Sequence, residues 1–348
     1  MTTPILLAYS GGWRSQLALE SLVARHPGRV VTLTLDLGQG VELADVRARA
    51  LATGAVRAHV LDVREAFALR FVRPLLGAGA RLDGHLVGPS APTLPIVAEQ
   101  LALVAGMEGS SCVAHGGAPD DRRRLESDVR LVDPRVSFVD VPGRDDWAVG
   151  EASAPVADRN LWGRTMTSPT LLRTWEEPAE ELFTLTEAPA AASDMPALVD
   201  IEVADGQPSR VNGVAMSFVE LVASLETIAG DHGVGRLDLI EPRGDGTMKR
   251  VVAEAPAAVV LDSALRALEA LVYDASLGRL ARQVGDAYGA LLAEGRWFSP
   301  TRDVLDAFVT RAHALVSGTV RLRLFKGECR VVGRSVRGAD TPASRRGA

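Results

Sequence analysis

The stretch LLAYSGGWRSQL, at residues 6–17, is the most informative part of this sequence. The apolar run at 5–8 predicts a buried strand, and the spacing of apolar residues at 18–23 predicts a helix soon after Ser10-Gly11-Gly12. Glycines in such a loop let backbone N–H groups face a ligand, and the following helix adds unpaired N–H groups and a positive dipole end. The stretch therefore predicts a phosphate-binding loop, although it matches neither GxxxxGK[ST] nor GxGxxG.

Length and composition predict a globular protein of about two domains. The chain has 348 residues, of which 47% are hydrophobic and 24% charged, and it contains no apolar run long enough to cross a membrane. We read no signal peptide and expect a cytoplasmic protein. The net charge of -6 gives no basic surface for nucleic acid. Cys112 and Cys329 lie in apolar runs and are expected to be buried thiols.

The first half of the chain alternates strands and helices, which predicts a parallel sheet with helices on both faces. Polar or glycine-rich loops follow three of the expected strands, at 10–12, 36–39 and 115–117. Ligands bind at the carboxyl ends of parallel strands, so these loops should converge on one edge. The further strands are expected at 30–36, 58–61, 110–114 and 136–140, and the helices at 41–51, 63–75 and 96–105.

The second half has an α+β character. A hinge is expected at 145–155, so the predicted domains are residues 1–155 and 156–337, followed by a disordered tail at 338–348. We interpret 160–170 as a loop. Strands are expected at 199–203, 236–241 and 257–261, helices at 217–229, from 263 onward and from 300, and a hairpin at 320–332.

Several stretches together resemble argininosuccinate synthases. They are AYSGG at 8–12, DLGQG at 36–40, VAHGG at 113–117, NLWGR at 160–164, HGVGR at 232–236, WFSP at 297–300 and GTVRLRLFKGECRVVGR at 318–334. The resemblance implies an α/β fold: a parallel-sheet pyrophosphatase-loop nucleotide-binding domain followed by an α+β synthetase and oligomerisation domain. It also implies ATP, with Mg²⁺ bound to it, as cofactor. The family adenylates the ureido oxygen of citrulline, and the amino group of aspartate then displaces AMP.

The resemblance implies a set of nucleotide-binding residues. Ser10, Gly11, Gly12 and Ser15 would hold the pyrophosphate, in front of the helix dipole. Ala8, Tyr9 and Leu35 would surround the nucleotide, and Ala114, His115 and Gly116 would form the far wall.

The sequence departs from the family pattern next to the phosphate loop. The family's loop reads SGG[x]D[ST], whereas Arg14 stands here in place of the Asp. Arg14 either pairs with phosphate itself, which would relieve the need for a cation, or points to solvent and weakens the site. The later family loop ATGKGNDQVRFE reads GAPDDRRRLE here, in which Asp121 and Arg124 match and Asp120 replaces an Asn. We take Arg14 and Asp121 as candidate catalytic residues, and Asp120 and Arg124 as candidate substrate-binding residues.

The positions that would contact the acceptor substrate are also altered. Ser90 is kept, but the stretch 88–95 loses the Thr and Arg of the family's GTSLARP. Val156 replaces a Ser and Ala253 replaces a Tyr. His85 stands where a Tyr is expected and is either a substrate ligand or an ordinary surface or core residue. Thr165 conservatively replaces a Ser, and Glu241 is retained, which leaves His85, Ser90, Thr165 and Glu241 as candidates.

Three hypotheses follow. The first is an ATP-dependent C–N ligase with altered substrates, which adenylates a carbonyl, ureido or carboxylate oxygen and condenses it with an amine. The second is a genuine argininosuccinate synthase, and the third is a non-catalytic nucleotide-binding homologue. The partners expected are small-molecule substrates. The family's C-terminal arm is shortened after 335, so a homodimer or a homotetramer is expected.

Overall fold

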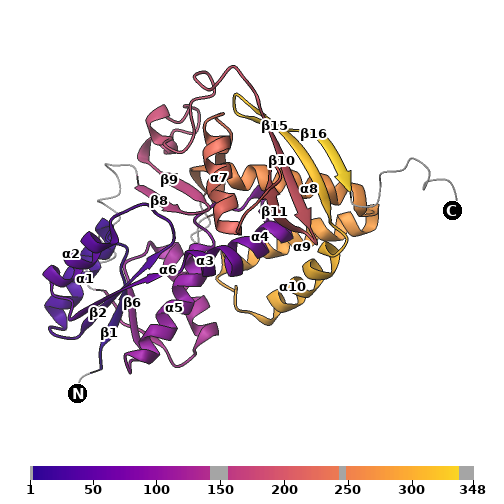
Figure 1. Ribbon diagram of the computed structural model, residues 1–348. Helices are drawn as coiled ribbons and strands as arrows, with labels where there is room; N and C mark the ends of the chain where they lie inside the picture. Colours follow the sequence, from indigo (N-terminus) through magenta and orange to yellow (C-terminus); the bar gives the residue numbers. More distant parts are fainter. Residues whose placement is uncertain (1–2, 142–155, 243–247, 337–348) are drawn as a thin grey trace.

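The computed structural model describes residues 3–141, 156–242 and 248–336 (Figure 1). The hinge expected at 145–155, the predicted boundary at 155 and the tail at 338–348 therefore lie outside the described residues or at their edge. Within the described ranges no helix is both long and apolar enough to span a membrane.

The N-terminal domain is built on a five-stranded parallel sheet in the order β3-β2-β1-β6-β7. The chain builds outward from β1 in one direction and then resumes on its other side with β6, so the strand order reverses between β1 and β6. Such a reversal opens a ligand position at the carboxyl ends of these two strands. The strands are β1 Ile5–Ala8, β2 Val30–Asp36, β3 Arg57–Asp62, β6 Cys112–His115 and β7 Ser137–Phe138.

Helices cover both faces of this sheet, as the alternating pattern predicted. Helices α1 (Trp13–Arg25) and α2 (Leu43–Thr53) pack on one face, where Leu7 and Leu19 share a buried cluster. Helix α5 (Thr93–Met107) lies on the other face with α6. The remaining elements are α3 Arg64–Phe67, the π-helical turn η1 Ala68–Val72, α4 Arg73–Ala78, the short strands β4 Arg81–Leu82 and β5 His85–Leu86, and α6 Pro119–Val132.

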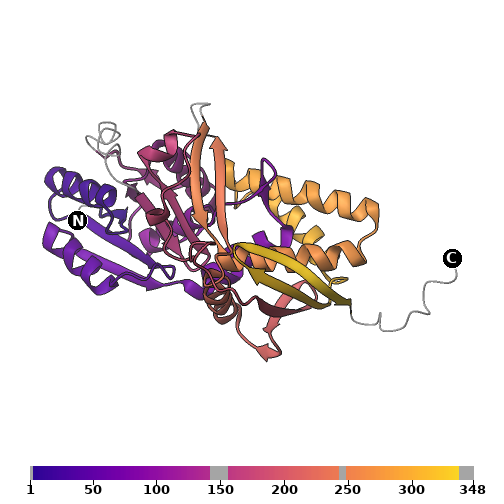
Figure 2. The same cartoon turned by 90° about the horizontal axis from the view of Figure 1, so that it is seen from above.

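A second sheet follows, in the order β13-β14-β9-β8 and antiparallel throughout. The loop expected at 160–170 is largely a hairpin instead, because β8 (Val156–Asn160) and β9 (Gly163–Thr167) pair around a tight turn. Strands β13 (Arg236–Pro242) and β14 (Met248–Glu254) complete the sheet. In Figure 2 this sheet lies between the N-terminal domain and the C-terminal helices.

The third sheet has the order β12-β11-β10-β15-β16, and α8 packs against β15 and β16. The strand expected at 257–261 is wrong, because these residues lie inside α8, which begins at Pro256. A capping box at Ser217 begins α7, where the sequence placed it. The elements are β10 Ala197–Ala204, β11 Gln207–Val211, β12 Val214–Ala215, α7 Phe218–Gly230, α8 Pro256–Val272, α9 Ala275–Glu294, α10 Pro300–His313, β15 Gly318–Phe325 and β16 Glu328–Val336, with the 3-10 turns η3 Pro169–Leu172 and η4 Glu180–Leu182.

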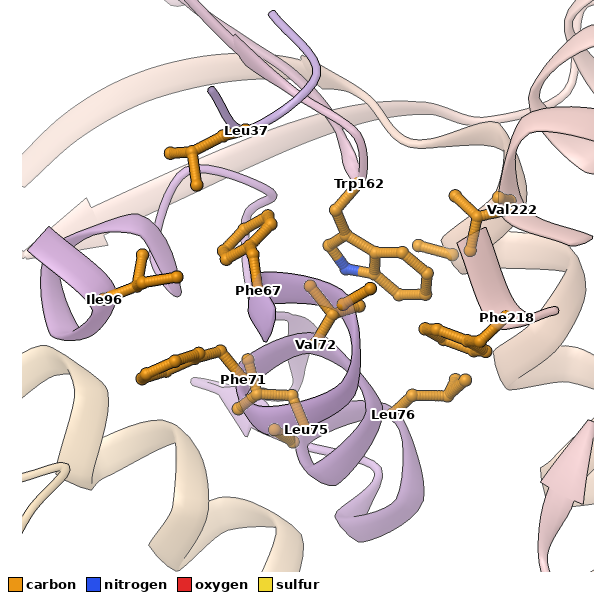
Figure 3. Close-up of a cluster of buried hydrophobic side chains, with 14 of the residues drawn as sticks. Leu37, Phe67, Phe71, Val72, Leu75, Leu76, Ile96, Trp162, Phe218 and Val222 are labelled. Atoms are coloured by element: carbon orange, nitrogen blue, oxygen red, sulfur yellow. The ribbon is translucent and has the colours of Figure 1, made fainter. Parts of the chain in front are cut away.

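One buried cluster joins the two halves of the chain (Figure 3). Trp162, in the turn between β8 and β9, is 6% exposed and points between Phe67 of the N-terminal domain and Phe218 of α7. The rings of Trp162 and Phe218 are 6.4 Å apart. Apolar packing of this kind is the main source of folding free energy, so the relative position of the two halves is fixed by a shared core.

Candidate functional site

The loop after β1 has the geometry that the sequence predicted. Gly11 has a φ of +77°, which side-chain-bearing residues rarely adopt, and a Cβ on it would lie 3.0 Å from a methyl group of Val46. Ser10 and Gly12 are exposed at the end of the strand. In the part of the chain that the structure describes, no side chain caps the N-terminus of α1. Its first-turn N–H groups are therefore available to an anion.

Ser15 stabilises this loop from inside. Its side chain is buried, and its hydroxyl donates to the carbonyl of Gly12 at 2.9 Å. The backbone N–H of Ser10 donates to the Ser15 hydroxyl oxygen at 3.3 Å. Ser15 thus shapes the loop rather than presenting an exposed hydroxyl.

The loop after β6 lies beside the phosphate loop. Ala8 pairs with His115 in the register of β1 and β6, so both strands end at the same level. A Cβ on Gly116 would lie 2.6 Å from the carbonyl oxygen of Arg14, so only glycine permits the close approach of this loop to α1. The buried His115 ring packs edge-to-face on Phe138 at 5.7 Å and accepts the Gly117 N–H through Nδ1 at 3.2 Å.

Two of the predicted nucleotide-binding residues use their side chains elsewhere. Tyr9 is 2% exposed, and its hydroxyl donates to Gln16 at 2.6 Å within the layer of α1 and α2. Burial raises the pKa of this phenol. Leu35 belongs to the core on the opposite face of the sheet, whereas Ala114 of β6 is buried in the same cluster as Tyr9. Their contribution to a nucleotide site is limited to backbone atoms and shape.

The segment expected as a loop after Gly117 is the beginning of α6. Pro119 occupies the first turn, and Asp120 and Asp121 lie at the positive end of the helix dipole, where carboxylates are stabilised. The guanidinium of Arg124 donates to Asp121 at 2.6 Å. The predicted pair Asp121 and Arg124 is therefore one ion pair on the first two turns of a helix.

Arg14 lies beside this helix, and it is half-buried rather than extended into solvent. Its guanidinium is 5.2 Å from the centre of the Trp13 ring. Burial lowers its pKa, which the negative charges of Asp121 and Asp158 partly offset. Arg14 thus interacts with a carboxylate of the N-terminal domain and with one on β8.

Opposite these residues stands one face of the second sheet. Asp158, Thr165 and Ala253 are direct neighbours across β8, β9 and β14, so their side chains share a face. Glu241 and Lys249 form a direct pair across β13 and β14 on the same face. This face meets the N-terminal domain, because a Cβ on Gly88 would lie 3.3 Å from Glu241 Oε1 and 3.7 Å from Leu239.

The two sides together form a group of charged side chains, which we call the charge cluster. Asp158 is accessible to solvent, yet the surrounding protein removes enough water to raise its pKa, and Asp121 raises it further. Burial likewise raises the pKa of Glu241, against the opposing effect of Lys249 and Arg124. The charge cluster consists of Arg14, Asp121, Arg124, Asp158, Glu241 and Lys249.

Four members of the charge cluster were predicted from the sequence, namely Arg14, Asp121, Arg124 and Glu241. Sequence reasoning missed Asp158 and Lys249. Asp158 lies two residues before the NLWGR stretch, which was a usable signal. No sequence signal pointed to Lys249, because the strand β14 was not expected.

The other predicted substrate ligands are more scattered. Thr165 is buried on the sheet face described above. Ser90 is half-buried in the turn just before α5, where its carbonyl accepts the N–H of Thr93 at 3.1 Å. Asn160 fixes this segment by donating to the Pro89 carbonyl at 2.8 Å. His85 is exposed on β5. In the described ranges no group of three or more His, Cys, Asp or Glu side chains is placed to hold a metal ion.

A parallel α/β domain with a glycine loop at the strand reversal, facing a sheet that carries paired charges, defines a nucleotide-binding enzyme fold of two parts. Residues 4–155 match the family described as the arginosuccinate synthase N-terminal HUP domain, and residues 156–339 match the arginosuccinate synthase C-terminal domain. The chain belongs to the argininosuccinate synthase family, which is a family of ATP-dependent ligases.

Named relatives agree with this assignment. The chain is 38% identical to the argininosuccinate synthase of Acaryochloris marina, over 95% of this chain and 88% of that protein. It is 36% identical to the argininosuccinate synthase of Synechococcus elongatus, with the same coverage. It is 34% identical to that of Geotalea daltonii, over 95% of this chain and 86% of the relative.

Proposed function

We propose that this protein is an AMP-forming C–N ligase. Its first candidate substrates are ATP, citrulline and aspartate. The observation that carries the proposal is the Ser10–Gly12 loop, exposed at the strand reversal with the uncapped N-terminus of α1 behind it. The names of the relatives support citrulline and aspartate as the substrate pair. Residues 4–155 would bind the nucleotide, and residues from 156 onward would supply the acceptor side.

The chemistry balances without a redox partner. The ureido oxygen of the acceptor attacks the α-phosphorus of ATP, and pyrophosphate leaves. The amino nitrogen of the second substrate then attacks the activated carbon, and AMP departs with the acceptor's oxygen. The protein's task is mainly to hold the groups in place and to stabilise charge.

The residues of the charge cluster would divide this task. The first-turn N–H groups of α1, behind the Ser10–Gly12 loop, and the guanidinium of Arg14 would hold the departing pyrophosphate, and Mg²⁺ would arrive with the ATP. The ion pair of Asp121 and Arg124 would orient the amine substrate. Glu241, on the opposite sheet, would bind the acceptor.

A second candidate is the same chemistry on a different acceptor or amine. Ala253 favours it, because this fully buried small side chain supplies no hydroxyl at its own position, beside Thr165 on the acceptor face. The stretch 88–95, which meets the same face at Gly88, has no basic side chain either. Each missing polar contact costs about 1–3 kcal/mol when its partner is buried.

The experiment that distinguishes the two candidates traces the ureido oxygen of citrulline. Purified protein is incubated with ATP, aspartate and citrulline labelled with ¹⁸O in the ureido group, and AMP is examined by mass spectrometry. Argininosuccinate together with ¹⁸O in the AMP supports the first candidate. Pyrophosphate release only with another acceptor supports the second.

A non-catalytic homologue would behave differently from both. It would bind ATP in calorimetry but would release no pyrophosphate with any acceptor of a broad panel. Failure to bind ATP would contradict the proposal as a whole.

We also propose that the protein is a homodimer or homotetramer, which sedimentation of the purified chain tests directly.

A further inference from the structure

Lysine is rare in this protein. Among its 38 basic residues, Lys249 and Lys326 are the two lysines, and the rest are arginines. Lys326 lies in the turn between β15 and β16 and forms an ion pair with Asp194 at 2.7 Å. Lys249 lies in the charge cluster and is half-buried. An ammonium is a compact point charge that binds single oxygen atoms of an anion, unlike the planar fork of arginine.

The register of the second sheet fixes where Lys249 points. It is the direct partner of Glu241, and it lies two and four residues from Val251 and Ala253 on the same strand. These alternate positions share the face that meets Gly88. Lys249 therefore projects from the acceptor side of the site toward the N-terminal domain.

Lys249 interacts with its carboxylate neighbours through space. Its charge lowers the pKa of both Asp158 and Glu241. Within the described residues, however, neither a hydrogen bond nor a contact ion pair joins the Lys249 ammonium to either carboxylate. A half-buried ammonium whose neighbours stop short of contact retains donors for a further anion.

The facing segment supplies no competing cation. Residues 88–95 contain neither Lys nor Arg, and Asn160 fixes their position through the carbonyl of Pro89. Arg124 is already paired with Asp121 on α6. Among the described residues on this face of the sheet, Lys249 is thus the cation on the acceptor side.

We propose that Lys249 is the specificity-determining residue of the acceptor site and binds a carboxylate of the acceptor substrate. This inference rests on the proposed function. It applies to citrulline and equally to any ureido or carbonyl acceptor that carries a carboxylate. Glu241 and Asp158, on either side, then favour an acceptor whose remaining polar groups are neutral or positive.

The two lysines make a labelling experiment possible in one sample. The protein, saturated with a non-hydrolysable ATP analogue, is treated with limiting acetic anhydride, and acetylation of the two lysine peptides is measured by mass spectrometry. Citrulline and 5-ureidopentanoate are the carboxylate probes, and citrullinamide is the matched control without the carboxylate. Lys326 is the internal reference.

We expect either carboxylate probe to slow acetylation of Lys249 at least fivefold while Lys326 is unchanged, and citrullinamide to have little effect. Equal protection by citrullinamide, or none by both carboxylates while the analogue is bound, overturns the inference. Failure of the ATP analogue to bind contradicts the proposed function instead.

Kinetics of variants give a second measurement. Lys249→Met should raise the KM for the acceptor on the order of 10-fold to 100-fold, because a charge-assisted hydrogen bond is lost, with the KM for ATP within twofold of the parent. Lys249→Arg should recover part of the loss. Lys326→Met is the control and should match the parent. Parallel changes in both KM values, or none, would argue against a role in acceptor selection.

Discussion

Asp128 on α6 accepts a hydrogen bond from the backbone N–H of Trp297, 169 residues further along the chain, at 2.9 Å. The N–H of Phe298 also favours the charged form of this carboxylate, against the burial that raises its pKa. A Cβ on the nearby Gly295 would lie 2.3 Å from the carbonyl of Arg124, so the two segments are in close contact. The helix that carries Asp121 and Arg124 is thereby held against the segment between α9 and α10.

Asp128 predicts a pH-dependent stability. Burial raises its pKa to about 7, whereas an unfolded Asp titrates near 4. The folded state therefore binds the proton more tightly, so raising the pH from about 4 to about 7 lowers the free energy of unfolding, by at most about 4 kcal/mol. In Asp128→Asn this contribution is absent. Urea unfolding at pH 5 and pH 8 measures the difference, and identical pH dependence of both proteins would contradict the prediction.

Gly116→Ala should damage the phosphate site. Its Cβ would collide with the carbonyl of Arg14, which displaces the first turn of α1 from the loop. We expect ATP affinity in calorimetry to fall at least 10-fold. Gly106→Ala is the matched control, because this helical glycine has no atom near its missing Cβ; it should bind ATP normally and gain up to about 1 kcal/mol of stability. Normal ATP binding by Gly116→Ala would show that the two loops can separate without loss.

Arg14→Asp tests whether the guanidinium assists phosphate binding. The substitution restores the family's residue type but places a third carboxylate near Asp121 and Asp158. We therefore expect the KM for ATP to rise at least 10-fold, through charge repulsion. Arg123→Asp, on the exposed side of α6, controls for a general change in net charge and should alter the KM less than threefold. An Arg14→Asp enzyme with unchanged or improved ATP kinetics would assign Arg14 no role in binding phosphate.

Glu254→Gln should destabilise the fold away from the site. Its carboxylate is fully buried, accepts the backbone N–H groups of 184–186 and the Thr186 hydroxyl, and lies 3.3 Å from the guanidinium of Arg164. Removing the charge leaves the half-buried Arg164 guanidinium without its carboxylate partner and weakens the N–H bonds to the buried side chain, which costs about 3 kcal/mol. Chemical denaturation measures the loss, and the exposed Glu181→Gln should stay within about 0.5 kcal/mol of the parent.

The sequence predicted best those features that depend on neighbouring residues. The strand, loop and helix around Ser10–Gly12 follow from local apolar spacing and two glycines, and the capping box at Ser217 is equally local. The run at 257–261 misled for the opposite reason. Its β-branched residues resemble a strand, yet α8 is buried around most of its surface, so its helical periodicity is hidden. Pro256 at the first helical turn was the available signal.

The residues of the candidate site show the same difference between local and long-range determinants. Arg14, Asp121, Arg124 and Glu241 could be found because each lies in or beside a recognisable stretch. Lys249 could not, because its place in the site depends on the pairing of β14 with β9, which lies far from it in sequence, as well as with the neighbouring β13. Cross-strand pairing is set by tertiary packing, and a single sequence carries little information about it.

The core around Trp162 has a consequence for engineering. Because Trp162, Phe67 and Phe218 pack together across both halves, neither half presents a finished surface when the other is removed. A chimera that joins this N-terminal half to the C-terminal half of a relative would leave mismatched apolar side chains at the junction. Transferring the acceptor side into another ligase therefore requires transferring the matching aromatic residues of both halves as well.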